Sequence, residues 1–431
     1  MRADALQQPS VQFQQVTRGA GDRLSYSLVL LALILLPGER VDLPLSLKPV
    51  DFVLVLIMAY GILKSPTSGR RFYFPLVFPF WLILIAGLLA TIGGLDRAAS
   101  VTAIIQEIYL YAWFFLLTNL LAGFSFSNLD RLFKIWASIA VIEAIVTLMG
   151  MMTSGLEIFY TSPENEVLAS FTGLARGLGT FVNPNAAGAY LSISIFVTLS
   201  TSWSKLLRLG IASILFAGIF GSGSLGALLS SSVGLLALGW MSYFWGKPQL
   251  PEIRRSFLVL IGGIMILGFC VVFLILLVIP AIPILMEQEW LALTLGRLPR
   301  SFDLRLQLLS RAWSAYIIHP IGIGPNAAQT FSGAVHNDYA AFLFERGLLG
   351  LVGWLLFVGS WLLSPLLAAG KEEWLPARWA LLCLAAGLFA CAINAFTHEI
   401  SHFRQLWMLL AFTFAIKYMV NARTSNPALD G

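Results

Sequence analysis

Apolar runs recur along almost the whole chain, each bounded by a polar or charged segment. Helices and closed barrels are the only structures that satisfy every backbone polar group in lipid. A helix needs about 20 mainly apolar residues to cross the hydrocarbon core, and most of these runs come close to that length. The expected spans are 24–36, 50–63, 73–92, 98–121, 132–152, 184–203, 206–220, 225–245, 257–285, 348–369, 379–396 and 406–420. We therefore expect an all-α polytopic membrane protein with about twelve transmembrane helices.

The composition supports this class. Of the 431 residues, 58% are hydrophobic and only 11% are charged, whereas about 25% of residues are charged in a typical soluble chain. A soluble protein of this length would need a charged exterior, and so few charges do not provide one. The composition therefore excludes an ordinary soluble domain.

The basic residues predict how the chain is oriented. If the N-terminus is cytoplasmic, 17 of the 27 Lys and Arg residues fall in cytoplasmic segments, five in short outer loops and five in one long outer segment. Lys and Arg favour the cytoplasmic side, and this bias explains the net charge of +5 better than nucleic-acid binding does. We expect cytoplasmic tails at 1–23 and 421–431, helices one to nine within 24–285 with an outer loop at 155–183, a large extracytoplasmic loop at 286–347, and helices ten to twelve within 348–420.

The two outer segments are long enough to carry chemistry. The second contains an apolar pattern that predicts an amphipathic helix over 303–317, with one side formed by Leu304, Leu308, Leu309, Ala312 and Tyr316. Together the segments would form a cap on the outer side of the membrane domain.

All four histidines fall on the outer side in this topology, and His336 has the most suggestive neighbours. It opens the segment H-N-D-Y, with Asn337 and Asp338 next, at the expected start of a helix. An imidazole with a pKa of about 6.5 accepts a hydroxyl proton near neutral pH, and Asn337 or Asp338 could orient it. The same residues also suit an ordinary helix N-cap, because Asn and Asp favour that position. The residues alone leave both interpretations open.

Arginines in the outer segments are candidates for binding phosphate. Arg176 lies in the glycine-rich segment G-L-A-R-G-L-G-T-F-V-N-P-N, just before the span that begins at residue 184. A cation beside flexible backbone and helix N-termini is suited to a phosphate group. The second outer segment adds Arg297, Arg300, Arg305 and Arg311, followed by the turn P-I-G-I-G-P-N at 320–326. The alternative is contact with lipid headgroups, the commoner role for any single outer arginine.

The segment H-E-I-S-H matches the H-E-x-x-H pattern of zinc proteases. On a helix, His398 and His402 would share a face and could bind zinc, with Glu399 as general base. A third protein ligand is needed, and the only His, Glu, Cys or Asp after His402 is Asp430, in the expected cytoplasmic tail. A zinc membrane protease is therefore a minor alternative.

The two outer segments together resemble the O-antigen ligase and O-antigen polymerase superfamily of bacterial envelope enzymes. The resemblance rests on R-G-L-G-T-F-V-N-P-N at 176–185, on Arg305 in the loop helix followed by H-P-I-G-I-G, and on H-N-D-Y…E-R-G-L-L-G at 336–350. The motifs occur in the family's order and spacing, and with the twelve-span layout the resemblance covers most of the chain. The segment G-S-G-S-L-G-A-L-L departs from the family, because it lacks the arginine that often opens the span after the seventh.

The resemblance implies a C-type membrane glycosyltransferase that works at the outer face of the bacterial cytoplasmic (inner) membrane. It would move a glycan from undecaprenyl diphosphate to a hydroxyl of lipid A core or of a growing polysaccharide, within the lipid bilayer and with no cofactor, metal or nucleic acid. By resemblance, His336 activates the acceptor, whereas Arg176 and Arg305 hold the diphosphate, with inversion at the anomeric carbon. The further residues expected to bind substrate are Asn185, Asn337 and Asp338.

A membrane transporter, for example of inorganic carbon or of an envelope precursor, is the alternative from another class. Transporters place ionisable groups near the midplane of the bilayer, often on broken helices. Here the acidic residues deep in the spans are Glu107 and Glu143, and no matched pair of interrupted spans is evident. The sequence does not separate a ligase from a polymerase or from a protein glycosyltransferase.

Overall fold

The computed structural model describes residues 20–38, 48–68, 72–152, 176–245, 297–328 and 336–424. Within these ranges the regular structure is entirely helical. The helices are α1 (Ala20–Leu35), α2 (Pro49–Ser68), α3 (Val77–Ile92), α4 (Arg97–Leu121), α5 (Phe126–Met152), α7 (Pro184–Ser200), α8 (Lys205–Ser222), α9 (Leu225–Trp245), α13 (Arg297–Ile318), α15 (Asp338–Lys371), α16 (Leu375–Asn394) and α17 (Arg404–Thr424).

The all-α prediction is confirmed for this part of the chain. A helix occupies every expected apolar run except 257–285, which lies outside the described residues. Most of the expected tails, most of the outer loop 155–183 and a smaller part of the outer segment 286–347 also lie outside them. Six of the described helices are long and apolar enough to cross a membrane, namely α4, α5, α8, α9, α15 and α16. Twelve spans and an outer cap remain predictions.

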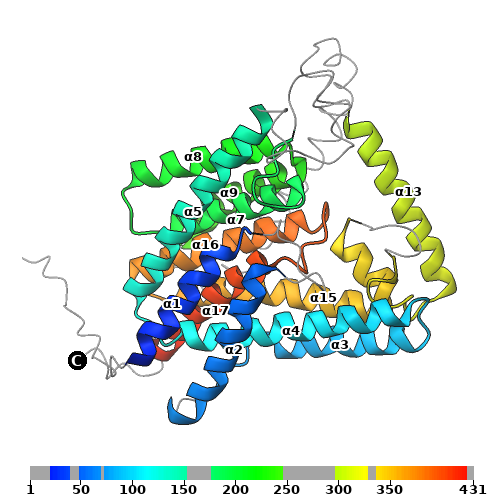
Figure 1. Ribbon diagram of the computed structural model, residues 1–431, viewed down its shortest axis with the longest axis horizontal. Helices are drawn as coiled ribbons and strands as arrows, with labels where there is room; N and C mark the ends of the chain where they lie inside the picture. The colour runs from blue at the N-terminus through cyan, green and yellow to red at the C-terminus, as the bar shows by residue number, and fades with distance from the viewer. Residues whose placement is uncertain are drawn as a thin grey trace, which may run out of the picture.

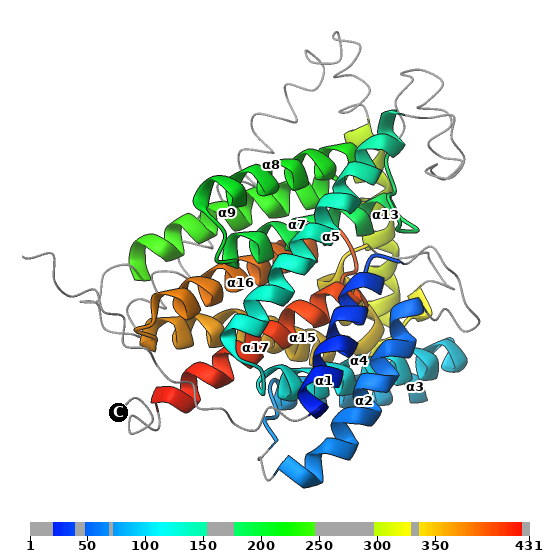
Figure 2. The same ribbon diagram turned by 60° about the vertical axis from the view of Figure 1, so that its left-hand side comes forward.

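Two helices form the centre of the bundle. Helix α16 packs against α7, α9, α15 and α17, and α7 packs in turn against α5 and α8. Nearly every side chain of α7 and α16 is buried. Figures 1 and 2 show α5, α8 and α9 on one side of this pair, and α15 and α17 on the other, with α1 to α4 beyond them. A helix that is apolar all round belongs in such a position, because it has no face for water.

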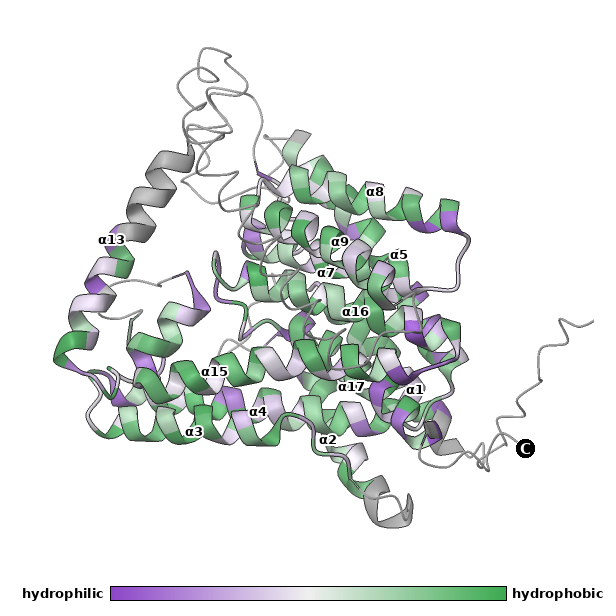
Figure 3. Cartoon of the chain, turned by 180° about the vertical axis from the view of Figure 1, so that it is seen from behind, coloured by the Kyte–Doolittle hydropathy of each residue, from purple (hydrophilic) through white to green (hydrophobic). Residues whose placement is uncertain are grey.

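The outer helices carry a surface suited to lipid. Large apolar side chains are exposed along α3, where Phe78, Trp81 and Ile92 are each more than half exposed. Helices α8 and α15 show similar exposed residues, and apolar colouring dominates these three helices in Figure 3. So much contiguous apolar surface would be unfavourable in water, and it fits helices that contact acyl chains.

Hydrogen bonds at the helix ends show that successive helices run in opposite directions. At one end, Thr180 before α7 donates to the carbonyl of Pro37 after α1, and Leu95 after α3 donates to the carbonyl of Ile323. At the same end, Arg404 opens α17 and pairs with Asp51 in the first turn of α2. We call this the His336 end of the bundle, since His336 also lies there.

The opposite end is tied together by its own contacts. Asn119, near the end of α4, bonds to the backbone of Tyr73, just before α3. Lys134 in α5 donates to Ser202 after α7, and Trp379 in α16 donates to the carbonyl of Leu199. The alternation that the apolar runs and charges predict is thus present in the described helices.

The longest helix, α15, is broken at Gly347. Its φ of 67° and ψ of −169° lie in a region that essentially only glycine adopts. The rings of Phe342 and Trp354 stack with centroids 4.5 Å apart, whereas these positions in a straight helix would lie about 18 Å apart along its axis. The first segment, 338–346, therefore folds back beside the second segment, 348–371 (Figure 1).

The turn at 320–326 joins the two segments at the break. The N–H groups of Ile323 and Gly324 donate to the carbonyls of Phe344 and Glu345, each at 3.0 Å. These are the last carbonyls of the first segment, which lose helical partners where a helix stops. The turn also contacts α3, because Leu95 donates to the carbonyl of Ile323 at 2.9 Å. The backbone groups that the break releases therefore find new partners.

A buried ion pair fixes the same segment to α4. The guanidinium of Arg346 makes two hydrogen bonds with the carboxylate of Glu107, one of them at 2.8 Å, and both side chains are buried. The guanidinium also lies over the ring of Phe342, 4.6 Å from its centroid. Removing one partner of a buried pair leaves an uncompensated charge and costs about 3–5 kcal/mol. Glu107 therefore has a structural role that its position in the sequence does not reveal.

The break generates a stability prediction. A Cβ at Gly347 would lie 2.6 Å from the carbonyl oxygen of Pro320, in a backbone conformation that side chains avoid. We expect Gly347→Ala to destabilise the protein by about 2 kcal/mol or more, which would lower the unfolding temperature of the purified protein in detergent by several degrees.

The matched control is Gly359→Ala in the same helix. A Cβ there meets no atom within 4 Å, and alanine favours a helix interior over glycine. This variant should unfold at or slightly above the wild-type temperature. Equal unfolding temperatures for both variants would contradict the description of the break.

Candidate functional site

The start of α15 is a capped helix N-terminus, as one interpretation of H-N-D-Y predicts. Asn337 is the N-cap, and its side-chain oxygen accepts from the backbone N–H of Ala340 at 3.1 Å. His336, just before the cap, has a φ of 52°, in the left-handed region that non-glycine residues seldom occupy. Such a conformation costs about 1–2 kcal/mol and persists only where other contacts hold it.

The loop between α16 and α17, residues 395–403, lies directly against this helix start. It is built from turns: Thr397 and His398 both donate to the carbonyl of Asn394, and Phe403 donates to the carbonyl of Ile400. Its end is fixed by Arg404, whose guanidinium makes bonds of 2.8 and 2.7 Å to the carboxylate of Asp51. The loop is therefore anchored at both ends, by α16 and by α2.

Two carboxylates join the loop to the start of α15, and we call this arrangement the carboxylate clamp. Asp338 accepts from the backbone N–H groups of Ile400 at 2.8 Å and Ser401 at 3.2 Å, and from the Ser401 hydroxyl at 2.8 Å. In the other direction, Glu399 accepts from the backbone N–H of His336 at 3.0 Å. Each segment thus supplies a carboxyl group that accepts hydrogen bonds from the backbone of the other.

The clamp places two imidazoles side by side. The rings of His336 and His398 are nearly parallel, at 12°, with centroids 5.8 Å apart. His398 is buried and packs against the ring of Phe403, whereas His336 is half-buried. The His336 ring therefore lies against His398 and is partly exposed to solvent. This placement suits a group that exchanges protons with a substrate.

The zinc-protease interpretation of H-E-I-S-H finds no support in this geometry. Residues 397–403 form turns, so His398 and His402 lack the helical spacing that would put them on one face. Among the described residues, no group of three or more His, Cys, Asp and Glu side chains could hold a metal ion. Burial lowers the pKa of His402, and the carboxylates of Glu107 and Glu399 act in the opposite direction.

Arg176 is oriented by two different elements. Its Nε donates to the carbonyl of Ser222 at 2.9 Å, and its Nη2 donates to Oδ1 of Asn185 at 2.8 Å. Its side chain lies against Gly223, where a Cβ would be 3.1 Å from Nε. Gly223 belongs to G-S-G-S-L-G, the segment that has no arginine of its own. The guanidinium thus lies near the amino ends of α7 and α9, where helix dipoles favour an anion.

The segment from Arg176 to Asn183 is fixed to α5. The backbone N–H of Thr180 donates to the carboxylate of Glu143 at 2.8 Å. The Thr180 hydroxyl lies 2.8 Å from the other carboxylate oxygen and shares its proton between Glu143 and the carbonyl of Pro37. Gly179 has a φ of 58°, and a Cβ there would overlap this carboxylate. Glu143, which the sequence places deep in a span, therefore holds the loop that carries Arg176.

The first turn of α9 connects Arg176 with His336. Gly226 packs against Thr397 so closely that a Cβ would overlap its side-chain oxygen. Thr397 precedes His398, whose ring lies beside that of His336. Just before α9 begins, the carbonyl of Ser222, the last residue of α8, accepts from Arg176. The structure therefore places both predicted residues at the His336 end of the bundle.

Arg305 lies in α13, which contains the predicted helix 303–317, but its side chain is outside the described residues. Of the predicted apolar side, Leu308 is buried, Tyr316 half-buried and Leu309 exposed. The second half of α13 packs on the first segment of α15, where Ala315 and Tyr316 contact a cluster that includes Phe344. The helix that carries Arg305 is thus attached to the segment that follows His336.

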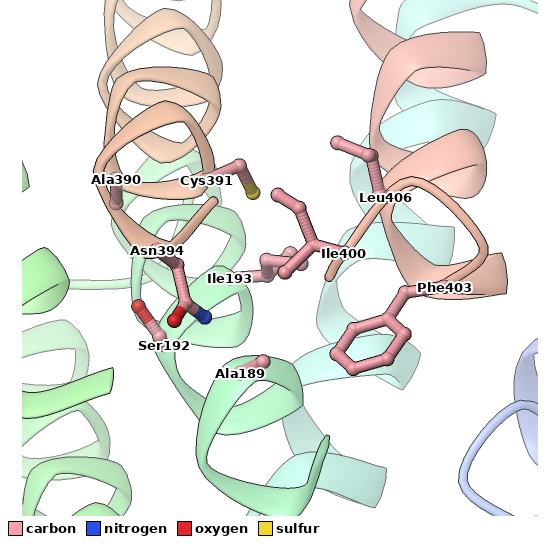
Figure 4. A pocket seen from close by; sticks show the side chains of 9 residues that line it. All are labelled: Ala189, Ser192, Ile193, Ala390, Cys391, Asn394, Ile400, Phe403 and Leu406. Atoms are coloured by element: carbon pink, nitrogen blue, oxygen red, sulfur yellow. The ribbon is translucent and has the colours of Figure 1, made fainter. Parts of the chain in front are cut away.

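A small cavity lies behind the loop, between α7, α16 and α17 (Figure 4). Its polar lining residues are Ser192 and Asn394, and Ile400 and Phe403 of the loop complete it. Carboxylates, imidazoles and cations are absent from its lining among the described residues. The titratable groups lie on the clamp, so we locate the chemistry there.

The structure adds two residues that the sequence interpretation did not assign to the site, Glu399 and His398. Both belong to H-E-I-S-H, a segment that could be singled out from the sequence only through its match to a zinc-protease pattern. The structure also gives Asn337 and Asp338 hydrogen-bond partners in the protein, the helix cap and the clamp. These two residues hold the start of α15 in place.

The clamp predicts a specific cost when its acceptor is removed. In Asp338→Ala the N–H groups of Ile400 and Ser401 and the Ser401 hydroxyl lose the oxygens that accept from them. We expect a loss of about 1–3 kcal/mol of stability, measured as a lower unfolding temperature in detergent. Asp96→Asn is the control, since Asp96 uses one oxygen to cap α4 and Asn caps equally well. A similar effect of both changes would contradict the clamp.

Comparison with known proteins gives one family match, over part of the chain. The O-antigen ligase family model matches residues 210–355. This stretch includes Arg305, the turn at 320–326 and His336, whereas Arg176 precedes it. The search of curated proteins gives no match. The resemblance that the sequence motifs indicate is confirmed over these residues: the chain contains an O-antigen ligase domain at 210–355, and this domain supports a membrane glycosyltransferase of the O-antigen ligase and polymerase type.

Proposed function

We propose that the protein transfers a glycan from undecaprenyl diphosphate to an acceptor hydroxyl, with the reaction taking place at the His336 end of the bundle. The observation that carries this proposal is the clamp, which holds the half-buried imidazole of His336 at the same end as the guanidinium of Arg176. A base for the acceptor and a cation for the leaving group are the two groups that this reaction needs.

The reaction proceeds in one displacement. The neutral imidazole of His336 takes the proton of the acceptor hydroxyl while the oxygen attacks the anomeric carbon of the donor sugar. The bond from that carbon to the diphosphate oxygen breaks, and its electron pair leaves with the diphosphate. Attack opposite the diphosphate inverts the anomeric configuration. The negative charge that develops on the leaving oxygen is where a fixed cation lowers the barrier most.

The proposed roles follow from these requirements. Arg176 binds the diphosphate, and Asn185 orients its guanidinium through the 2.8 Å hydrogen bond. Arg305, in α13, is the second proposed cation. Guanidinium groups bind phosphate oxygens in two-pronged fashion and so fill the place that a divalent cation takes in other transferases. Asn337 and Asp338, expected to bind substrate, act in this proposal by holding the start of α15.

The buried acids favour this function over transport. Glu107 pairs with Arg346, and Glu143 accepts a hydrogen bond from the backbone N–H of Thr180. Both carboxylates therefore have structural partners in the described residues. The one broken helix among the described elements, α15, is interrupted near its amino end at the His336 end of the bundle. Lipid A core and a growing polysaccharide are both suitable acceptors, since each offers a sugar hydroxyl.

The proposed orientation puts the His336 end at the periplasmic or outer face of the cytoplasmic membrane, because the lipid-linked donor displays its assembled glycan there. A reporter fused after Gly246 should be cytoplasmic, and one inserted near Ser332 should be outside, as measured by paired enzyme reporters active on only one side. A cytoplasmic signal at Ser332 would contradict both the orientation and the donor.

Substitutions should separate the base from the cations. We expect His336→Ala to reduce transfer by about 10²–10⁴-fold with little change in donor binding, because the base acts on the acceptor. Arg176→Ala and Arg305→Ala should weaken donor binding by about 10–100-fold as well, since charge-assisted bonds to phosphate form in the ground state too. Lysine at either arginine should restore only part of the binding, because it lacks the planar fork. Binding and transfer are measured together in reconstituted protein.

Arg97→Ala provides the matched control. Arg97 is an exposed arginine at the same end of the bundle, and its guanidinium donates to the carbonyl of Ile92. Its loss should leave donor binding unchanged. Full transfer by His336→Ala would refute the proposed base. Equal losses of donor binding in Arg97→Ala and Arg176→Ala would show that any positive charge at this end has the same effect, and would refute a specific contact between Arg176 and the diphosphate.

A further inference from the structure

We propose that Glu399 is a positioning residue for His336, acting through the backbone rather than as an acid, a base or a metal-site residue. The inference rests on the proposed function, in which His336 is the base. It assigns a purpose to the glutamate of H-E-I-S-H that the zinc-site interpretation of that segment does not give.

The contact that carries the inference is the 3.0 Å hydrogen bond from the His336 backbone N–H to Oε1 of Glu399. His336 is one of three non-glycine residues with positive φ in the described part of the chain. An unfavourable backbone conformation needs a contact that over-determines it, and this N–H has a carboxylate as its acceptor. The bond thus acts on a residue whose backbone conformation is unfavourable by itself.

Glu399 is itself held on both sides. The next two residues, Ile400 and Ser401, donate their backbone N–H groups to Asp338, and the preceding residue, His398, donates to the carbonyl of Asn394. Asp338 also donates its own N–H to the carbonyl of Ala395 at 2.9 Å. The carboxylate of Glu399 therefore projects from a fixed loop onto a fixed helix start, with His336 as the residue between them.

Backbone conformation decides where the imidazole lies. The Cα–Cβ bond of His336 follows its φ and ψ, so relaxation to a common conformation would rotate the ring away from His398, now 5.8 Å away and nearly parallel. The loss of a catalytic base from its position lowers turnover, because general-base catalysis depends on hydrogen-bond distance to the hydroxyl. Donor binding by Arg176 involves other elements and should not depend on Glu399.

Three substitutions separate the length of the Glu399 side chain from its charge. Glu399→Gln keeps a side-chain oxygen at the same length without the charge, so the bond to the His336 N–H survives. Glu399→Asp keeps the charge but is one methylene too short. Glu399→Ala removes both. We expect Gln to retain transfer within about threefold of wild type, and Asp and Ala to lose about tenfold or more, in the maximal rate rather than in donor KM. Glu373→Ala and Glu373→Gln, at an exposed position near the opposite end of the bundle, should match wild type.

Amide hydrogen exchange at His336 gives a readout that needs no activity. Mass spectrometry with single-residue fragmentation should show this amide exchanging about tenfold faster or more in the Asp and Ala variants than in wild type, with the Gln variant close to wild type. Unfolding temperatures measured alongside show whether a variant has lost its fold or only this contact.

The positioning role is supported if Glu399→Gln retains transfer while Glu399→Asp and Glu399→Ala lose it, and if amide exchange at His336 is faster in the same two variants. If Gln is as inactive as Ala while Asp is active, the carboxylate charge is what matters and the inference is overturned. Unchanged exchange at His336 in Glu399→Ala overturns it as well. If wild type itself transfers no lipid-linked glycan, or His336→Ala is active, the proposed function fails, and the exchange data still decide whether Glu399 holds His336.

Discussion

The rest of the site depends on the hydrogen bonds that Asp338 and Glu399 each accept from the backbone of the other's segment. Asp338 holds the backbone of Ile400 and Ser401, and Glu399 holds the backbone of His336. Without these hydrogen bonds, the first segment of α15 and the loop after α16 would be separate polar segments at the membrane edge. With them, the two segments form one unit, in which an unfavourable conformation at His336 persists and two imidazoles lie in parallel.

The surrounding ion pairs keep that unit in a fixed place in the bundle. Arg346 attaches the first segment of α15 to Glu107 of α4, and Arg404 attaches the end of the loop to Asp51 of α2. Both pairs are buried, where the desolvation of each charge is costly and the partner is indispensable. The break at Gly347 then lets α15 begin inside the bundle end and still continue as a span. Membrane helices, broken backbone and buried charges thus serve one purpose, which is to hold titratable groups at a defined depth.

Much of the fold could be predicted from the sequence because lipid imposes a strong constraint. Apolar runs such as 98–121 and 225–245 become helices with almost the predicted bounds, and Asn337 caps a helix as its residue type favours.

Contacts between residues that are distant in the sequence could not be predicted. Glu107 and Arg346 stand far apart in sequence, and nothing local pairs them. A zinc site at H-E-I-S-H requires helical spacing, whereas α16 ends at Asn394 and leaves these residues in turns. Arg176 could be predicted at the site, but its partners Ser222 and Asn185 follow from the meeting of α7, α8 and α9.

The central claim is that a lipid-linked diphosphate and an acceptor hydroxyl meet between Arg176 and His336. The most direct measurement is an experimental structure of the protein in a lipid nanodisc with undecaprenyl diphosphate or a non-transferable glycan derivative bound. The account predicts diphosphate oxygens within hydrogen-bond distance of the Arg176 guanidinium, with the position of the anomeric carbon facing the His336 imidazole. A diphosphate bound at the opposite end of the bundle, near Lys134 and Lys417, or bound with His336 directed away from it, would contradict the account.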